Sequence, residues 1–245
     1  MTVGSDGAVD PDTPANFDVM LGRTKLDPPP EDELRKKWLS WIELIDKDLT
    51  MLATHRMIWR GLNEVWTQRE PPLPFSHLFS YLARTYAHSQ AAGIRRHGDV
   101  HRDAAGLTRL LRDIKSHPDR ISREFYVSRF TWGQQHIGDK QFEAFDPKRS
   151  GFLNPDLAAA DLVTLEQAAE KAKTWVDNNI AHLSASSSDE VPTIEELDNA
   201  LDVIGDIFIR WNAVLTGAGL VSIQPSPQYD WAAPLRVPWI LGDVQ

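Results

Sequence analysis

Apolar residues recur at helical spacing along most of the chain, beginning with a stripe between about residues 31 and 67. Its tryptophans and aliphatic residues stand seven positions apart at Trp38, Ile45, Leu52, Trp59 and Trp66. This interval, with further apolar residues three or four positions away, places one apolar face along an α-helix. At 1.5 Å per residue the helix would span roughly 50 Å. The pattern predicts one long helix whose tryptophans belong to the core.

The middle of the chain predicts shorter helices. Prolines between positions 71 and 74 end the first helix, and the next carries apolar residues from Leu78 to Ile94 before a break near Gly98. Residues 103–115 and 122–130 show the same period over shorter lengths. Residues 131–155 show no clear period and contain several glycines and prolines, so we expect a long connection there.

Two later segments return to the helical period. Residues 156–182 predict one helix, and a Ser-rich loop follows it. Thr193 and Glu196 form a capping-box pattern, after which apolar residues alternate in steps of three and four as far as Leu215. Gly217 then stands where helices commonly end.

The chain as a whole therefore predicts an all-α protein. No segment alternates as a strand would, and no internal repeat is visible. We expect a disordered or extended tail over residues 1–30 and a helical bundle with one long N-terminal helix over residues 31–220. Residues 221–245, rich in proline and tryptophan, are expected to be extended and packed on the bundle.

Composition excludes several classes of protein. The chain has 245 residues and no cysteine, so disulfides, thiolate metal sites and cysteine nucleophiles are excluded. No apolar run approaches the roughly 20 residues that span a bilayer. The first residues have neither a basic nor an apolar region typical of a secretion signal. We expect a cytoplasmic protein without a membrane partner.

Charge is distributed unevenly along the chain. The net charge of −9 argues against a protein that is basic overall, yet residues 84–129 hold ten basic and five acidic residues. This excess fits a solvated, arginine-rich helix face, and it also fits a surface that binds phosphate groups. Both interpretations remain open from the sequence.

The most concentrated group of candidate catalytic residues lies at the end of the helix expected over residues 156–182. The run from Asp177 to His182 includes Asn178 and Asn179, so two amides precede an imidazole that titrates near neutral pH. Such groups suit proton transfer on a nucleotide or nucleic-acid substrate. The alternative is structural: the two asparagines finish the helix, and His182 forms a local hydrogen bond.

A metal site is a weaker hypothesis. His97 and His101 are four positions apart, which would place them on one helix face, with Asp99 and Asp103 nearby. A third clear ligand is missing, and Gly98 weakens the helix between the two histidines. No glycine-rich phosphate loop is present either. We therefore assign neither a metal nor another cofactor.

The order of these elements resembles that of the HEPN superfamily, and within it the abortive-infection AbiU branch. The similarity covers roughly residues 35–215 and joins a long amphipathic helix to a later helix ending Asn-Ile-Ala-His. Between them stand Ile94-Arg95-Arg96, Asp99 and the apolar positions Leu107, Leu110, Leu111 and Ile114. The resemblance implies a helical bundle, commonly a homodimer, related to metal-independent ribonucleases or toxins of antiphage and toxin–antitoxin systems.

The superfamily motif is an arginine, usually followed by a polar residue, with a histidine four to six residues further on. His182 matches the histidine and Asn178 matches the polar position, but Asp177 stands where the motif has arginine. The missing cation could come from Arg95 or Arg96, if the helix that carries them packs against the end of the His182 helix.

The resemblance then implies an endoribonuclease with a degenerate active site. His182 would exchange a proton with a ribose 2′-hydroxyl or a leaving 5′-oxygen, and an arginine would stabilise charge on the phosphate. Asn178 or Asn179 would orient the reacting groups, while Arg95, Arg96 and Arg102 would bind substrate. Expected partners are RNA, a second copy of the chain, and an antitoxin or other protein. The alternative is a non-catalytic scaffold that binds RNA or protein.

Overall fold

The computed structural model confirms an all-α fold. It describes residues 32–68, 76–101, 104–181 and 191–233. Helices account for 76% of the described residues, which contain no strand. The expected tail over residues 1–30 lies outside this part of the chain. None of the described helices combines the length and apolarity needed to cross a membrane.

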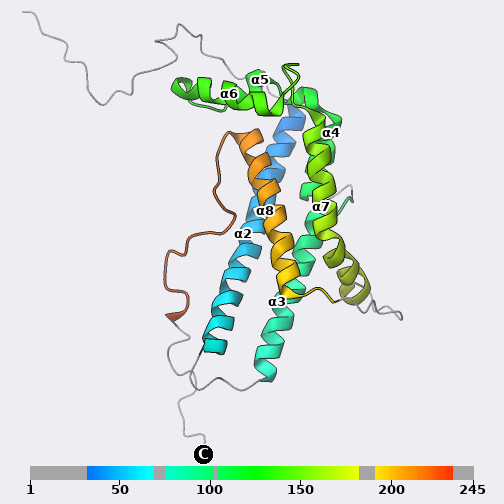
Figure 1. The fold of residues 1–245 in the computed structure, drawn as a ribbon, viewed down its shortest axis with the longest axis vertical. Coiled ribbons are helices and arrows are strands. Elements are labelled where there is room, and N and C mark those ends of the chain that lie inside the picture. Colours follow the sequence, from blue (N-terminus) through cyan, green and yellow to red (C-terminus); the bar gives the residue numbers. More distant parts are fainter. Residues whose placement is uncertain (1–31, 69–75, 102–103, 182–190, 234–245) are drawn as a thin grey trace, which may run out of the picture.

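Four long helices form the bundle (Figure 1). They are α2 (Glu33–Gln68), α3 (His77–His97), α7 (Pro155–Val176) and α8 (Ile194–Thr216). The short helix α4 (Leu107–Ser116) follows α3 toward the other end of the bundle and packs against α7. The last turn of α3 therefore lies at mid-height.

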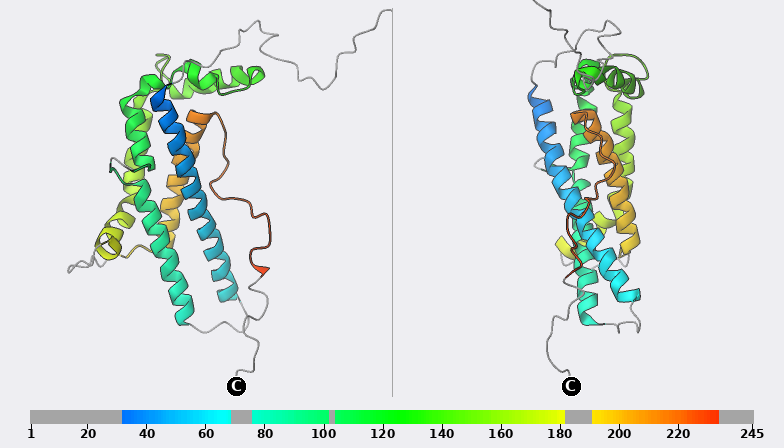
Figure 2. Two further views of the ribbon diagram at one scale, coloured as in Figure 1. Left: turned by 180° about the vertical axis from the view of Figure 1, so that it is seen from behind. Right: turned by 90° about the vertical axis from the view of Figure 1, so that its left-hand side faces the viewer.

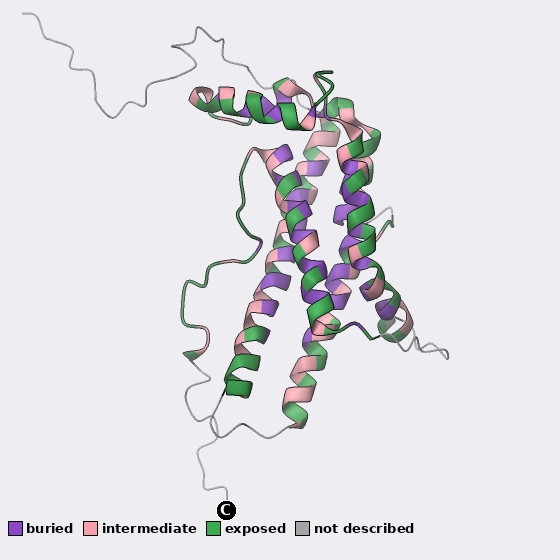
Figure 3. Ribbon diagram, viewed as in Figure 1, coloured by how far each residue is buried: buried purple, intermediate pink, exposed green. Residues whose placement is uncertain are grey.

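Helix α2 confirms the long stripe read from the sequence. Asp32 starts it, because its Oδ1 accepts the backbone N–H groups of Leu34 at 2.9 Å and Arg35 at 3.2 Å. Residues from Trp38 to Trp59 are buried along one face. Trp66 is only half-buried, since the far ends of α2 and α3 project beyond the core (Figure 3).

Helix α8 buries more residues than any other described helix. The predicted capping box is present: Thr193 Oγ1 accepts the Glu196 N–H at 3.1 Å, and Glu196 Oε2 accepts the Thr193 N–H at 2.7 Å. Twelve of its residues are buried, among them Phe208 and Trp211. Gly217 ends the helix in the left-handed conformation, with φ of 73°, which glycine adopts without strain.

The expectation of a long connection over residues 131–155 is wrong. After the 3-10 turn Pro118–Arg120, helix α5 (Arg123–Val127) leads through the 3-10 turn Trp132–Gln134 into helix α6 (Gln135–Phe145). Helices α5 and α6 lie across one end of the bundle (Figure 2). Because α6 buries only Gln135, Gly138 and Phe142, it needs no continuous apolar stripe.

Other boundaries also shift. Helix α4 begins at Leu107, because residues 104–106 are not helical, and α5 is shorter than the predicted segment 122–130. The regular part of α7 ends at Val176, and residues Asp177–Ala181 continue as a π-helical turn. A π turn places one more residue in each hydrogen-bonded ring than an α turn, so it turns the Asn178 and Asn179 side chains away from their α-helical positions.

The described part of the C-terminal segment runs along the outside of the bundle without helix or strand as far as residue 230 (Figure 1). Ile223 is buried against Gly205, where a side chain on the glycine would lie 2.9 Å from Ile223 Cδ1. Trp231 packs in the same way on Gly61 of α2. Two glycines on neighbouring helices thus provide the surface on which this segment rests.

A buried carboxylate near the start of α8 joins three helices. Asp198 of α8 accepts hydrogen bonds from Arg60 of α2 at 2.9 and 3.1 Å and from the Tyr86 hydroxyl of α3 at 2.5 Å. Burial and this hydrogen bond raise the pKa of Tyr86, so the hydroxyl stays protonated and donates at neutral pH.

Replacing Asp198 with alanine should destabilise the fold. Tyr86 would then lose its buried acceptor, at a cost on the order of 2 kcal/mol in the free energy of unfolding. Urea denaturation measures the change. The exposed Asp206 of the same helix is the matched control, and an equal effect of Asp206→Ala would contradict the role given to Asp198.

Candidate functional site

The candidate site is built around the end of α3, between α2 and α7. Gly98 caps the helix and donates its N–H to Ile94 O at 3.1 Å. A side chain at this position would place its Cβ 2.9 Å from the Cβ of Ala169 in α7. Glycine therefore allows the end of α3 to pack closely on α7.

Arg95 reaches the end of α7. Its Nε donates to Asp177 Oδ1 at 2.5 Å, and its Nη1 lies 3.7 Å from Asp99 Oδ2. The side chains of all three residues are about one-third exposed. A guanidinium from α3 thus contacts the residue that stands at the motif's arginine position. His182, five residues after Asp177, lies outside the described residues, as does Arg102.

The two asparagines lie in the π-helical turn. Asn179 Nδ2 donates to Trp175 O at 3.0 Å, a local bond that satisfies a carbonyl at the helix end. This contact agrees with the structural reading of Asn179. Asn178 follows Asp177 directly and is half-buried, whereas Asn179 is exposed.

Arg96 pairs with the opposite neighbour of α3. Its Nε and Nη2 contact the two carboxylate oxygens of Asp48 in α2, at 3.3 and 2.7 Å. His97 Nε2 lies 3.1 Å from Asp48 Oδ2, and the histidine is only 2% exposed. Arg95 therefore contacts the end of α7 and Arg96 contacts α2, so of the two only Arg95 pairs with Asp177.

The environment of Asp48 keeps its carboxylate ionised. Burial alone would raise its pKa, but the hydrogen bonds from His97 and Arg96 and their charges outweigh burial and lower the pKa from 3.8 to about 2. Asp48 is not among the residues predicted from the sequence. Its place in the sequence could have indicated a charged partner. Asp48 stands beside the buried stripe of α2, between Ile45 and Leu49, where an unpaired charge would be unfavourable.

Asp48→Asn should destabilise the protein at neutral pH and not at low pH. Because the pKa of Asp48 is lower in the folded state, its stabilisation is fully present above the unfolded pKa near 4 and is lost as the pH falls toward 2. A shift of this size corresponds to roughly 2 kcal/mol.

Urea unfolding of the wild type and of Asp48→Asn at pH 7, 5, 4 and 3 tests this linkage. The stability difference should be greatest at pH 7 and 5 and should shrink below pH 4. A difference that stayed constant over the whole series would show that the carboxylate charge does not hold the end of α3.

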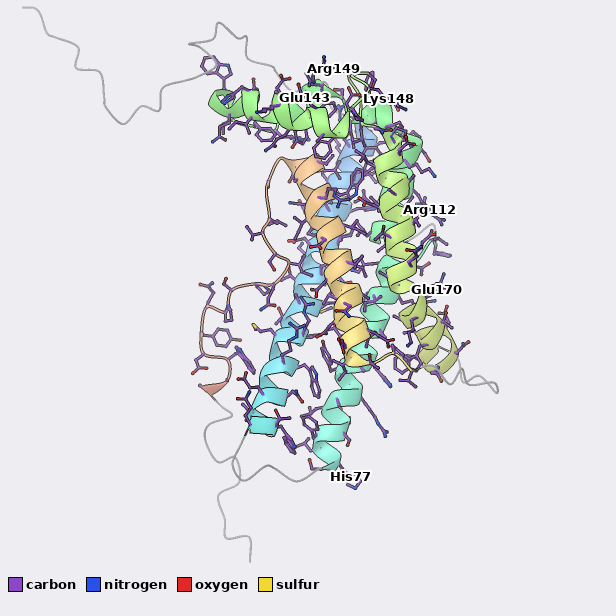
Figure 4. The ribbon with its side chains drawn as sticks, in the orientation of Figure 1. His77, Arg112, Glu143, Lys148, Arg149 and Glu170 are labelled. Carbon is purple, nitrogen blue, oxygen red and sulfur yellow. The ribbon has the colours of Figure 1, made fainter. Side chains whose placement is uncertain are left out.

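Two cavities flank the last turn of α3. The larger, about 520 Å³, lies on the α7 side and is lined by Gly98, Val100, Arg112, Glu166, Glu170 and Lys173, among others. Figure 4 shows Arg112 and Glu170 on this side of the molecule. The smaller, about 250 Å³, lies on the α2 side beside Arg96 and His97.

The arginine-rich stretch is largely neutralised by carboxylates. Arg95, Arg96, Arg109, Arg112, Arg120 and Arg123 each lie within 4 Å of an aspartate or glutamate oxygen. Several of these partners, such as Asp48, Glu166 and Asp177, come from outside residues 84–129. The excess of positive charge along the sequence therefore does not become an equally positive surface in the described fold.

The geometry removes the basis of the zinc hypothesis. Helix α3 ends at His97, so His97 and His101 do not share a helix face, and His97 is buried against Asp48. Within the described ranges, no group of three or more His, Asp or Glu residues is arranged to hold a metal ion. Asp103 lies outside those ranges.

Comparison with known proteins gives no independent indication of the family or function of this chain. Searches of protein-family models, of curated proteins and of solved structures find no match to this chain.

Proposed function

We propose that this chain is a HEPN-like protein of a prokaryotic defence or toxin–antitoxin system that cleaves RNA in the cytoplasm without a metal ion. The contact between Arg95 and Asp177 carries the proposal. It brings a guanidinium into contact with Asp177, the residue that occupies the motif's arginine position five residues before His182 in the sequence. Arg95 of α3 thus replaces the cation that the local sequence lacks.

In this reaction His182 accepts the proton of a ribose 2′-hydroxyl or donates one to the leaving 5′-oxygen. Arg95 stabilises the negative charge that develops on the phosphate oxygens, and Asn178 orients the phosphate. The cavity on the α7 side supports this assignment because Lys173 lines it one helical turn before Asp177. A strand of RNA lying there would meet a cation next to the reacting groups.

His182→Ala and Arg95→Ala should each abolish cleavage of a labelled single-stranded RNA in the presence of a chelator. Loss of one positioned acid or base costs on the order of 10²- to 10⁴-fold in rate. Loss of a group that stabilises transition-state charge costs roughly 10²- to 10³-fold. Arg84→Ala is the matched control, because Arg84 is exposed on the same helix three turns earlier.

The rates have meaning only where circular dichroism shows the variants folded as the wild type. Cleavage that stops on addition of chelator, or that survives unchanged in Arg95→Ala, would overturn the proposed site.

A non-catalytic scaffold is the second candidate, and one observation favours it. Arg95 already contacts Asp177 and Asp99, so two carboxylates compete with a phosphate for one guanidinium. If the wild type binds RNA or a protein partner, such as an antitoxin, without cutting, then Asp177→Arg should introduce cleavage by restoring the motif.

We also propose that the protein is a homodimer. Leu44, Met51 and Val65 are exposed on one face of α2 at multiples of seven residues, a spacing that suits pairing with another helix. Light scattering at micromolar concentration should give twice the mass of one chain, and Met51→Glu should shift the protein to monomer. A monomer at every concentration would contradict this.

A further inference from the structure

The smaller cavity, on the α2 side of α3, has its own set of polar groups. Its volume is about 250 Å³, and a water molecule in the liquid occupies about 30 Å³, so it has room for a small group and its hydration. It is lined by Leu44, Ile45, Asp48, Arg96, His97, Asp99, Ala104, Ala105 and Gly106. The cavity therefore lies between α2, the end of α3 and the start of α4.

His97 brings an unused hydrogen-bonding atom to this cavity. Its Nε2 lies 3.1 Å from Asp48 Oδ2 without forming a hydrogen bond of good geometry, and its Nδ1 has no hydrogen-bond partner among the described residues. A buried polar atom without a partner is unfavourable, so such an atom often marks a place where a ligand binds. A protonated ring carries an N–H group on both nitrogens, so Nε2–H faces Asp48 and Nδ1–H is a donor without an acceptor.

The start of α4 provides further donors. Gly106 is its N-cap and has no side chain to cap the first turn, so the first N–H groups of this ten-residue helix are not satisfied by a side-chain cap. A Cβ on Gly106 would lie 2.5 Å from Arg96 O. Glycine therefore brings the positive end of α4 against the residues that end α3.

Arg96 completes the set. Two of its nitrogens are held by Asp48, which fixes the plane of the guanidinium, and its side chain is 49% exposed. The other edge of the guanidinium can therefore donate to a ligand without first losing much conformational freedom.

We propose that this cavity binds a phosphate group, through Arg96, His97 Nδ1–H and the first N–H groups of α4. Asp48 does not oppose this, because it is paired with Arg96 and His97. Asp99 is likewise compensated: its Oδ1 accepts the His101 N–H at 2.9 Å, and its Oδ2 lies 3.7 Å from Arg95. The inference does not depend on RNA cleavage, because the site lies on the opposite side of α3 from Asp177.

The first test titrates the protein with inorganic phosphate, 5′-AMP and adenosine and follows amide chemical shifts. Phosphate and 5′-AMP should shift the Gly106 amide and its neighbours, and adenosine, which has no phosphate, should not. The ratio of the two affinities tells whether free phosphate or a nucleotide phosphate is the preferred source. No binding of either phosphate, or shifts confined to other helices, would overturn the proposal.

Arg96→Ala should weaken phosphate binding by about tenfold or more, because a charged donor is lost. Arg84→Ala, which removes an exposed arginine of the same helix that does not line the cavity, should change it by less than about twofold. Equal effects of the two substitutions would refute the site.

His97 is buried, so its replacement can disturb folding. Leu44→Glu avoids this problem, because Leu44 is 53% exposed at the edge of the cavity and the new carboxylate would repel phosphate. Met51→Glu, one heptad further along the same face of α2, is its control. Phosphate affinity should fall in Leu44→Glu only. Wild-type affinity in Leu44→Glu, or an equal loss in both variants, would place phosphate elsewhere.

Discussion

The last turn of α3 is held between carboxylates from two other helices. Asp48 of α2 pairs with Arg96 and His97, and Asp177 at the end of α7 pairs with Arg95. On the α2 side, Asp48 and His97 are mostly buried, and a buried charge that loses its partner is strongly destabilising, so this contact holds the turn against α2. The pair of Arg95 and Asp177 is about one-third exposed and adds a weaker link to α7. Both cavities of the site, and the close approach of Gly106 to Arg96, depend on the turn keeping this position.

The helices that cross the core could be predicted because their burial leaves a regular pattern in the sequence. Helix α8 shows this best, because its capping box, its buried face and its terminal Gly217 were all predicted from the sequence. Helix α6 was missed for the converse reason. It lies across the end of the bundle, and two of its three buried residues are Gln135 and Gly138, so the pattern of apolar residues alone did not reveal its helical face.

The site was predictable only in part. The motif pointed to the end of α7 and to an arginine from α3, but adjacent helical residues point about 100° apart. Only the packing of α3 decides that Arg95 faces α7 and Arg96 faces α2. Asp48 was invisible as a site residue because its partners are 48 and 49 positions away. For the same reason, the positive stretch of sequence gave no sign that distant carboxylates compensate it.

A charge exchange between Arg95 and Asp177 tests the central claim of the proposed function, that a guanidinium at this contact supports RNA cleavage. Arg95→Asp and Asp177→Arg are made singly and together, and RNA cleavage in chelator is compared among folded proteins. We predict that Arg95→Asp abolishes cleavage and that the double variant recovers it, because it returns an arginine to the same place with its carboxylate partner. A double variant as inactive as Arg95→Asp, although folded, would contradict the account.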